Sequence, residues 1–369
     1  MVRVAMVLLG DIRYDGRVRK EIRTLIDAGY EVELVVSDFS QSGSGGEGLG
    51  ARIHYIPMIL HSSPLRNFHE KLAFNWKAAA ILKERNLSHI HCHDLSSLLA
   101  GRWAKKKVKA DLIFDAHELM PESMGGYKER VWGFIEKRCI ESCDYILMPE
   151  KNRITYFQKK YPNSPEPLLL ENFPRKSEIP TGEVNLFRKV YPIEKWQRII
   201  LYTGILGPAR YLEELIESMT LCHDEFVLII LGRAFKGYDK ILSQKIKKLD
   251  LTKKIFLHEP VPHSDILRHM ASCDIGTAFY RNTNLNNYYC ASNKVYEYIA
   301  LSKAVLTNNY PGLLEAVESF GQGVCLPDIS PKNLFTAYYR ANDPTCVNPG
   351  ARKFFWEDRA GVLLELYER

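Results

Sequence analysis

The chain has 369 residues, of which 46% are hydrophobic and 25% are charged, and its net charge is +6. This length allows about two domains, and the composition excludes a disordered chain because enough apolar surface is present to form cores. A net charge of +6 is compatible with an anionic small ligand or an anionic membrane surface, but it is too small to indicate nucleic-acid binding.

The first nine residues are apolar except for Arg3, but charged residues follow them closely and no small-residue cleavage site is present. We therefore interpret this segment as a buried strand rather than as a signal peptide. No apolar run approaches the ~20 residues that span a bilayer, so any membrane contact is expected to be peripheral. The sequence has eight cysteines, and no two of them are spaced as C-x-x-C. They are expected to be buried, reduced thiols of a cytoplasmic protein, with the inner face of the membrane as the alternative location.

In the first half of the chain, short apolar runs alternate with helical patterns, which indicates a doubly wound parallel sheet. The expected strands are 2–9, 31–36, 53–58, 89–92, 112–115, 145–148 and 168–170. The expected helices are 17–28, 68–85, 96–106, 125–143 and 153–160.

Five prolines lie between residues 162 and 180, and such density is typical of a linker. A second alternating series follows. Its expected strands are 199–203, 226–231, 255–257, 275–278, 304–307 and 323–326, and its expected helices are 211–220, 238–249, 263–270 and 295–301. An amphipathic helix is expected at 352–368. We predict an α/β fold in which two Rossmann-like domains, 1–172 and 198–349, face each other and are joined by a linker at 173–197.

Several common nucleotide motifs are missing from the sequence. No G-x-G-x-x-G follows the first strand, which argues against a dinucleotide-dependent oxidoreductase. There is no P-loop pattern and no D-x-D pair, so neither a P-loop enzyme nor a metal-bound diphosphate is indicated. We expect no metal and no resident cofactor.

The helix expected at 17–28 begins with four cations, Arg17, Arg19, Lys20 and Arg23. Cations at a helix N-terminus oppose the helix dipole, at a cost of about 0.3–1 kcal/mol each. A bound anion would relieve this repulsion. The alternative is that the four side chains extend into water, and both interpretations stay open.

Two polar pairs follow predicted strands of the first domain. His93 and Asp94 come after the strand at 89–92, and His117 and Glu118 come after the strand at 112–115. The carboxyl ends of parallel strands form the ligand-binding edge of such sheets. A single histidine is usually structural, but two polar clusters at the same edge favour a site.

In the second domain, the segment from Gly204 to Arg210 lies between a strand and a helix, and Gly232 with Arg233 follows the next strand. Small residues let the backbone approach a phosphate, and an arginine can neutralise it. Near residue 293 a helix start adjoins the strand 304–307, with one acid, Glu297, in its first turns. A single acid at this position suits a pair of ribose hydroxyls.

Taken together, these motifs resemble the retaining glycosyltransferases of the GT-B fold, family four, also described as glycosyl transferases group 1. The resemblance extends over essentially the whole chain. It rests on D-x-R-V-R-K-E at 15–21, D-A-H-E at 115–118, G-x-x-x-x-x-R at 204–210, G-R at 232–233, S-N-K-V-Y-E-Y at 292–298, P-G-L-x-E at 311–315, and W-E…L-x-x-L-Y at 356–367.

The resemblance implies that the first domain holds the acceptor and the second holds a nucleotide-diphosphate-sugar donor, with the segment 350–369 packing back on the first domain. It implies that His117 faces the donor sugar and that Glu297 holds the ribose, and we take these two as the catalytic pair. The implied donor residues are Gly204, Arg210, Gly232, Arg233, Asn293, Lys294 and Glu297. The implied acceptor or phosphate residues are Asp15, Arg17, His93 and Glu118.

Two positions depart from the family pattern. Tyr289 stands where the family often has an acid, and Ile205 stands where it often has an arginine. Lys294 is our candidate for the second cation. The resemblance further implies a metal-independent reaction with retention, because cationic side chains and helix N-termini stabilise the leaving diphosphate.

Two other functions remain open. One is a nucleotide-sugar 2-epimerase of the same architecture, and the other is a catalytically degenerate nucleotide-sugar-binding protein. The acceptor is expected to be a glycan, possibly lipid-linked in the membrane. Arg66, Lys71, Lys77 and Lys83 beside Phe68, Leu72 and Trp76 fit a basic amphipathic membrane surface. An ordinary core helix fits the same pattern.

Overall fold

The computed structural model describes residues 2–347 and 354–369. The chain divides into two compact units, Met1–Glu171 with Glu357–Arg369, and Asn172–Trp356. The residues 173–197, expected as a linker, belong to the second unit, where Phe173 and Phe187 are buried in the apolar core.

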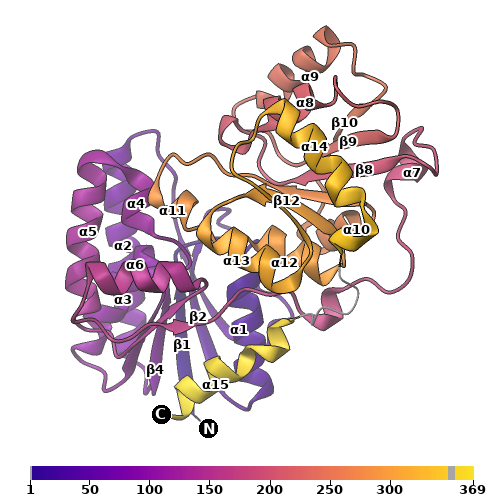
Figure 1. Ribbon diagram of the computed structural model, residues 1–369. Coiled ribbons are helices and arrows are strands. Elements are labelled where there is room, and N and C mark those ends of the chain that lie inside the picture. The colour runs from indigo at the N-terminus through magenta and orange to yellow at the C-terminus, as the bar shows by residue number, and fades with distance from the viewer. Residues whose placement is uncertain (1, 348–353) are drawn as a thin grey trace. The chain divides into compact units, whose positions relative to one another are not determined.

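The first unit contains a seven-stranded sheet in the order β3-β2-β1-β4-β5-β6-β7, in which every neighbouring pair is parallel (Figure 1). The strands are buried because helices cover both faces of the sheet, which explains their continuous apolar runs. The strands are β1 (Arg3–Leu8), β2 (Glu31–Asp38), β3 (Arg52–Pro57), β4 (His89–His93), β5 (Asp111–Asp115), β6 (Tyr145–Met148) and β7 (Leu168–Leu169).

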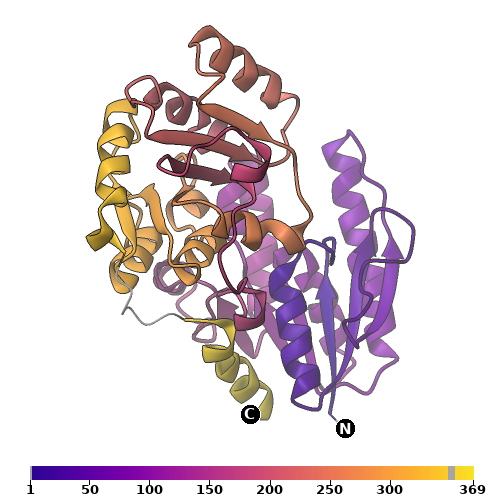
Figure 2. The same ribbon diagram turned by 90° about the vertical axis from the view of Figure 1, so that its right-hand side faces the viewer.

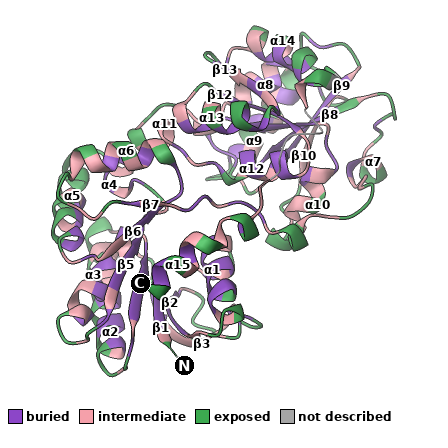
Figure 3. Cartoon of the chain, turned by 60° about the horizontal axis from the view of Figure 1, so that its bottom comes forward, coloured by how far each residue is buried: buried purple, intermediate pink, exposed green. Residues whose placement is uncertain are grey.

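Helices of the first unit lie on the two faces of this sheet, with α1 on one side and α2, α3 and α5 on the other (Figures 1 and 2). Figure 3 shows that the strands are mostly buried whereas the helices expose one side. The helices are α1 (Gly16–Asp27), α2 (Pro64–Lys83), α3 (Leu95–Lys105), α4 (Met120–Met124), α5 (Gly126–Ile140), α6 (Lys151–Lys160) and α15 (Ala360–Glu368).

The second unit contains a six-stranded parallel sheet in the order β10-β9-β8-β11-β12-β13. The strands are β8 (Arg198–Thr203), β9 (Phe226–Leu231), β10 (Ile255–His258), β11 (Ile275–Ala278), β12 (Ala304–Asn308) and β13 (Gly323–Leu326). The longer helices are α8 (Leu212–Ser218), α9 (Tyr238–Lys248), α10 (Ile266–Ala271), α12 (Asn293–Ala300), α13 (Pro311–Phe320) and α14 (Pro331–Asn342). The shorter ones are α7 (Phe187–Val190), α11 (Leu285–Tyr288) and the 3-10 turns Lys176–Glu178, Pro208–Arg210, His263–Asp265, Pro344–Cys346 and Trp356–Asp358.

The α/β class and the two doubly wound parallel sheets are confirmed. The sequence prediction omitted α13 and α14, although each starts at a proline in its first turn and α14 has a Ser330 cap that accepts from the Asn333 N–H. The helix expected at 125–143 begins at Gly126 instead, because Gly125 and Gly126 both have positive φ and interrupt it after α4. Of the helix expected at 352–368, residues 352–353 lie outside the described residues, and α15 begins at Ala360.

Each sheet reverses its winding direction at one point. In the first unit this point lies between β1 and β4, and in the second between β8 and β11. Ligands of open α/β sheets bind at the carboxyl ends of the strands beside such a reversal. The loops after β4 and β5, and the loops after β8 and β9, are therefore the places to search for a site.

All eight cysteines are unpaired, and six of them are buried, with Cys325 and Cys346 half-buried. Among the described residues, the model contains no helix whose length and hydropathy would let it span a bilayer.

Candidate functional site

Arg17 is the centre of a buried polar cluster at the carboxyl edge of the first sheet. Its side chain is 4% exposed. The Nε and Nη2 atoms donate to the two oxygens of Asp115 at 2.7 and 2.8 Å, and Nη1 donates to the Leu170 carbonyl at 2.7 Å. Because Asp115 ends β5, this bidentate pair attaches the first turn of α1 to the middle of the sheet.

His117 lies two residues beyond Asp115 and is held from several directions. Its Nε2 is 2.8 Å from Asp115 Oδ2, its Nδ1 is 3.7 Å from Asp94 Oδ2, and its backbone N–H donates to Asp94 Oδ1 at 2.9 Å. Arg153 Nη1 donates to the His117 carbonyl. Although burial alone would lower it, the carboxylates of Asp115 and Asp94 raise the pKa of His117 to about 10. The ring is therefore a cation at neutral pH.

His93, Glu21 and His91 form the inner layer of the same cluster. His93 Nδ1 is 3.4 Å from both Asp115 Oδ2 and His117 Nε2. Burial and the neighbouring Asp115 raise the pKa of Glu21 well above its ordinary value, and burial lowers the pKa of His91. His91 Nδ1 is 2.7 Å from the Tyr367 hydroxyl, which α15 brings from the end of the chain. This inner layer is therefore neutral. It lies below the cations Arg17 and His117 and the carboxylate of Asp115.

Glu21, His91, His93 and Asp115 offer ligand atoms that all lie within 4.8 Å of one another, which is a spacing that a metal ion could use. However, Arg17 already supplies a cation to this group, since its Nε is 2.7 Å from Asp115 and 3.1 Å from Glu21. Although burial opposes it, the guanidinium holds the pKa of Asp115 well below its ordinary value. Arg17 thus accounts for the carboxylates without a metal.

The structure brings together three of the predicted first-domain residues, Arg17, His93 and His117. The other two lie outside the cluster. Asp15 is the N-cap of α1 and accepts from the Val18 N–H at 3.0 Å, and Glu118 is exposed. Asp15 therefore relieves part of the charge repulsion expected at this helix start, because its carboxylate lies at the N-terminus.

The sequence indicated Asp94 only as part of a polar pair, and it gave no site role to Asp115, Glu21, His91, Arg153 or Tyr367. One available signal was the alternation of histidines at 89, 91 and 93, because period-two polar residues in a buried strand need partners on one face. Asp94 has φ +59°, a conformation that non-glycine residues rarely adopt and that often marks functional sites.

In the second unit, the loops after β8 and β9 approach each other through two glycines. A Cβ on Gly232 would lie 1.7 Å from the Gly204 carbonyl oxygen, and a Cβ on Gly204 would lie 3.0 Å from Lys294 Cε. Both glycines have positive φ, and the Leu206 N–H donates to the Arg233 carbonyl at 2.9 Å. Only glycine fits at these two positions, and Lys294 lies directly beside them.

Arg210 has an unsatisfied buried donor. Its guanidinium lies 4.5 Å from the ring centre of Tyr280, and its Nη1 is buried with no hydrogen-bond partner in the part of the chain that the structure describes. Tyr280 connects Arg210 to α12, because its hydroxyl is 2.7 Å from the Oγ of Ser292, the N-cap of that helix. A buried unpaired cationic donor is costly unless a ligand completes it.

Helix α12 starts beside these groups. The Ser292 side chain makes no capping hydrogen bond, and in the first turn the Val295 N–H donates to the Ser292 carbonyl at 3.1 Å. The side chain therefore does not occupy the N–H groups at the helix start. Lys294 is in the first turn, and Glu297 follows on the same helix, half-buried. Asn293 Oδ1 accepts from Asn172 Nδ2 at 3.0 Å. Gly204, Arg210, Lys294 and the start of α12 together form a site suited to an anionic group.

The two positions that depart from the family pattern, Ile205 and Tyr289, both lie in this region. Ile205 is 62% exposed, so its side chain projects from the loop that follows β8. Tyr289 ends α11 and is half-buried, with its ring centre 5.0 Å from that of Tyr288. Arg233 is exposed.

Comparisons with known proteins agree with this geometry. A family model described as glycosyl transferase 4-like domain matches residues 16–151, and one described as glycosyl transferases group 1 matches residues 183–337. No curated protein matches the chain.

Solved structures resemble the whole chain at low identity. Sucrose-phosphate synthase from Thermosynechococcus elongatus is 14% identical with a TM-score of 0.80, over 100% of this chain and 98% of that one. HepE from Anabaena in complex with UDP and glucose is 15% identical with a TM-score of 0.79, over 100% of both chains. A protein from Listeria monocytogenes described as a UDP-N-acetylglucosamine 2-epimerase is 12% identical with a TM-score of 0.68, over 98% and 95%.

The two family models match successive segments that together cover most of the chain, and the second segment contains all six strands of the second sheet. The chain is therefore a glycosyltransferase of the GT-B fold, with a glycosyl transferase 4-like domain in its first half and a glycosyl transferases group 1 domain in its second half.

Proposed function

We propose that the protein transfers a sugar from a nucleotide-diphosphate-sugar donor to a hydroxyl of a glycan acceptor, without a metal and with retention. The observation that carries the proposal is the buried, unpartnered Nη1 of Arg210 beside the start of α12. HepE forms a complex with UDP-glucose, so a uridine-diphosphate sugar is the first donor to test.

The charge of the diphosphate is neutralised by Arg210, Lys294 and the N–H groups at the start of α12. These groups act in place of a divalent cation, because they stabilise the negative charge that develops as the diphosphate leaves. Gly204 and Gly232 let the backbone approach the phosphates, and Glu297 accepts hydrogen bonds from the ribose hydroxyls. Asn293 and Arg233 complete the donor side.

In the proposed reaction, the acceptor oxygen forms a bond to the anomeric carbon on the face from which the diphosphate departs. The bond between that carbon and the diphosphate oxygen breaks, and the acceptor proton passes to a donor phosphate oxygen. His117 is not the base, because its pKa of about 10 keeps the ring protonated. We assign it the role of a charged hydrogen-bond donor to the sugar, positioned by Asp115, Asp94 and Arg153.

A thermal-shift screen over nucleotide sugars tests donor binding first. A donor present at 100 times its dissociation constant should stabilise the protein by about 2.7 kcal/mol. Transfer to an acceptor should then be lost in His117→Ala and Glu297→Gln, and it should continue in the presence of EDTA. If no nucleotide sugar shifts the melting temperature, the proposal fails.

The epimerase alternative is supported by the similarity to the Listeria monocytogenes structure. It predicts that the donor is converted without any acceptor. The binding-protein alternative predicts donor binding without transfer or hydrolysis, and Tyr289 and Ile205 are the positions that support it. Incubating the preferred donor with and without an oligosaccharide acceptor therefore distinguishes the three functions.

We infer a lipid-linked acceptor and a peripheral membrane contact from the surface of α2 and α5. A cavity of about 490 Å³ lies between these helices. Leu65 and Tyr127 at its rim are 66% and 71% exposed. Lys71 Nζ lies 5.4 Å from the Trp132 ring centre, and burial lowers its pKa.

Seven residues of α2 are predicted to form either an amphipathic membrane surface or part of an ordinary core helix, and the structure places some of them in each category. Phe68 and Leu72 pack on the core, whereas Trp76 is 68% exposed. Helix α2 contains four Lys or Arg residues and one Glu, so its polar side is basic. This combination of exposed aromatic and cationic groups supports binding to an anionic bilayer.

Flotation with phosphatidylglycerol vesicles tests the membrane contact. Leu65→Ser with Tyr127→Ser should abolish co-flotation, because these two side chains contribute the exposed apolar area at the rim of the cavity. Trp196→Ser with Ile241→Ser, which alters two exposed apolar residues of the second unit, should leave it unchanged. Equal flotation of the two double variants would contradict the inferred surface.

A further inference from the structure

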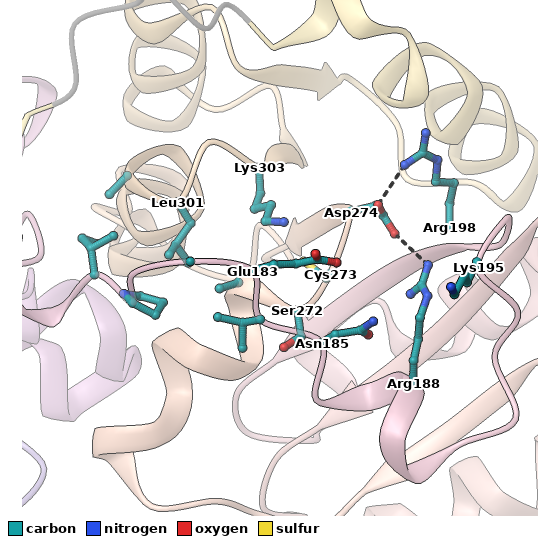
Figure 4. A pocket seen from close by; sticks show the side chains of 16 residues that line it. Glu183, Asn185, Arg188, Lys195, Arg198, Ser272, Cys273, Asp274, Leu301 and Lys303 are labelled. Carbon is teal, nitrogen blue, oxygen red and sulfur yellow. Dashed lines mark hydrogen bonds and ion pairs between the residues drawn. The ribbon is translucent and has the colours of Figure 1, made fainter.

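A polar cavity of about 620 Å³ lies in the second unit, at the edge of the sheet opposite to Gly204 and Lys294 (Figure 4). Arg198 opens β8, and Asp274 and Lys303 directly precede β11 and β12, so the cavity is at the amino ends of the strands. Gly204 follows the carboxyl end of β8. Six residues of strand separate the two ends by roughly 17 Å.

The lining of this cavity is rich in cations. Four basic side chains and two acidic ones face it: Arg188, Lys195, Arg198, Lys303, Glu183 and Asp274. The cavity thus has an excess of positive charge.

Asp274 is shared by both arginines. Arg198 Nη1 is 3.0 Å from one of its oxygens and Arg188 Nη2 is 3.8 Å from the other, as Figure 4 shows. The same carboxylate also accepts the Ile199 N–H at 2.8 Å. One carboxylate cannot neutralise two guanidinium groups, so positive charge remains in the cavity.

The two lysines have no acidic partner. In the described part of the chain, neither Lys195 nor Lys303 has a carboxylate oxygen within 4.0 Å. The C-terminal end of α12 explains why Lys303 is tolerated at this position, because cations are stabilised there. It does not explain Arg188 of α7, Lys195 of the following loop, or Arg198 at the start of β8.

We propose that this cavity binds a small molecule that carries two or more phosphate charges, at a site separate from the donor site. Guanidinium groups bind phosphate oxygens in pairs and ammonium groups bind them as point charges. The side-chain amide of Asn185 adds a neutral hydrogen-bonding group to the same wall. The volume lies within the range of ~300–1,000 Å³ that is typical of small-molecule pockets.

Calorimetric titration with inorganic pyrophosphate at constant ionic strength tests this site. The titration uses a variant with Arg210→Ala and Lys294→Ala as its background. These changes remove the two cations that the proposed donor site presents to a diphosphate, so that pyrophosphate binding in the cavity is measured separately from binding at the donor site. One saturable site should remain in this background. Adding Lys195→Ala and Lys303→Ala should weaken its affinity by about tenfold or more.

The matched control adds Lys240→Ala and Lys247→Ala of α9 to the same background, which removes the same charge from exposed residues outside the cavity. It should change the affinity by no more than roughly twofold, because exposed distant charges are screened. Pyrophosphate should also protect Lys303 from amine acetylation, as measured by mass spectrometry. The absence of saturable binding in the background, or an equal loss in the control, would overturn the proposal.

Discussion

Arg17 illustrates how a single side chain organises the first site. Its guanidinium binds both oxygens of Asp115 and the Leu170 carbonyl, and it lies 3.1 Å from Glu21. The sequence showed only that a cation at a helix start was unfavourable. The sequence left open whether a bound anion or water meets these cations, and for Arg17 the structure shows the protein's own Asp115, 98 residues away in the chain.

Replacing Arg17 by Met should destabilise the first unit strongly. The substitution removes the guanidinium that binds both oxygens of the buried Asp115 and leaves His117 as the remaining cation beside it. Breaking a buried pair in this way costs roughly 3–5 kcal/mol. Urea unfolding of the variant measures the loss. Arg23→Met is the control, because Arg23 pairs with Asp27 on the exposed side of the same helix. Comparable losses in the two variants would contradict the assigned role.

The protonation of His117 predicts a pH dependence of stability. Its pKa rises from 6.5 to about 10 in the folded chain. A raised folded pKa stabilises the protein fully below the unfolded value near 6.5, and this contribution is lost as pH rises towards 10. The difference in unfolding free energy between wild type and His117→Gln should therefore shrink between pH 6.5 and pH 10. A constant difference over this range would show that the ring is neutral.

At the scale of elements, α12 carries much of the proposed donor side. The sequence indicated a helix over 295–301 with its start near residue 293, and in the structure the helix begins at Asn293, which puts Lys294 in the first turn beside Gly204. Arg210 reaches the same helix through Tyr280 and Ser292. These residues come from two connections, one after β8 and one after β11, so no single local pattern contains them all.

Lys294→Ala should weaken the binding of a nucleotide diphosphate by about tenfold, because one charge-assisted contact to phosphate is lost. Isothermal titration with UDP measures this affinity. Lys332→Ala, a change of the same charge in the first turn of α14, serves as the control and should bind UDP normally. Unchanged affinity in Lys294→Ala would remove Lys294 from the donor site.

At the scale of the whole molecule, the first unit is completed by the last residues of the chain. Leu363, Leu366 and Tyr367 of α15 are buried in it, and Arg359 pairs with Glu171 at 2.9 Å. The Tyr367 hydroxyl bonds His91 across 276 residues of sequence. The buried cluster under His117 therefore depends on a segment that the chain reaches only after forming the second unit.

Tyr367→Phe should destabilise the first unit by about 1–3 kcal/mol, because His91 loses its partner in a buried position. Hydrogen exchange measured by mass spectrometry should show faster exchange in β1 and β4, with no change in β8 and β9. Tyr14→Phe, at a tyrosine that is 62% exposed, is the control. Faster exchange in both units would mean that the hydroxyl is not a local anchor.

The sequence by itself determined the alternation of strands and helices, the two doubly wound sheets and the strand ends that carry His93, His117 and Gly204. These features depend on periodicity and on short motifs, which are local. It also indicated Arg210, Lys294 and Glu297 through spacing and family resemblance. Only the tertiary structure decided that Asp15 caps a helix and that Glu118 is exposed, while Asp94, Glu21 and Tyr367 join the buried cluster. The physical reason is that a buried charge takes its partners from whatever segments pack around it, and that packing brings together residues far apart in the chain.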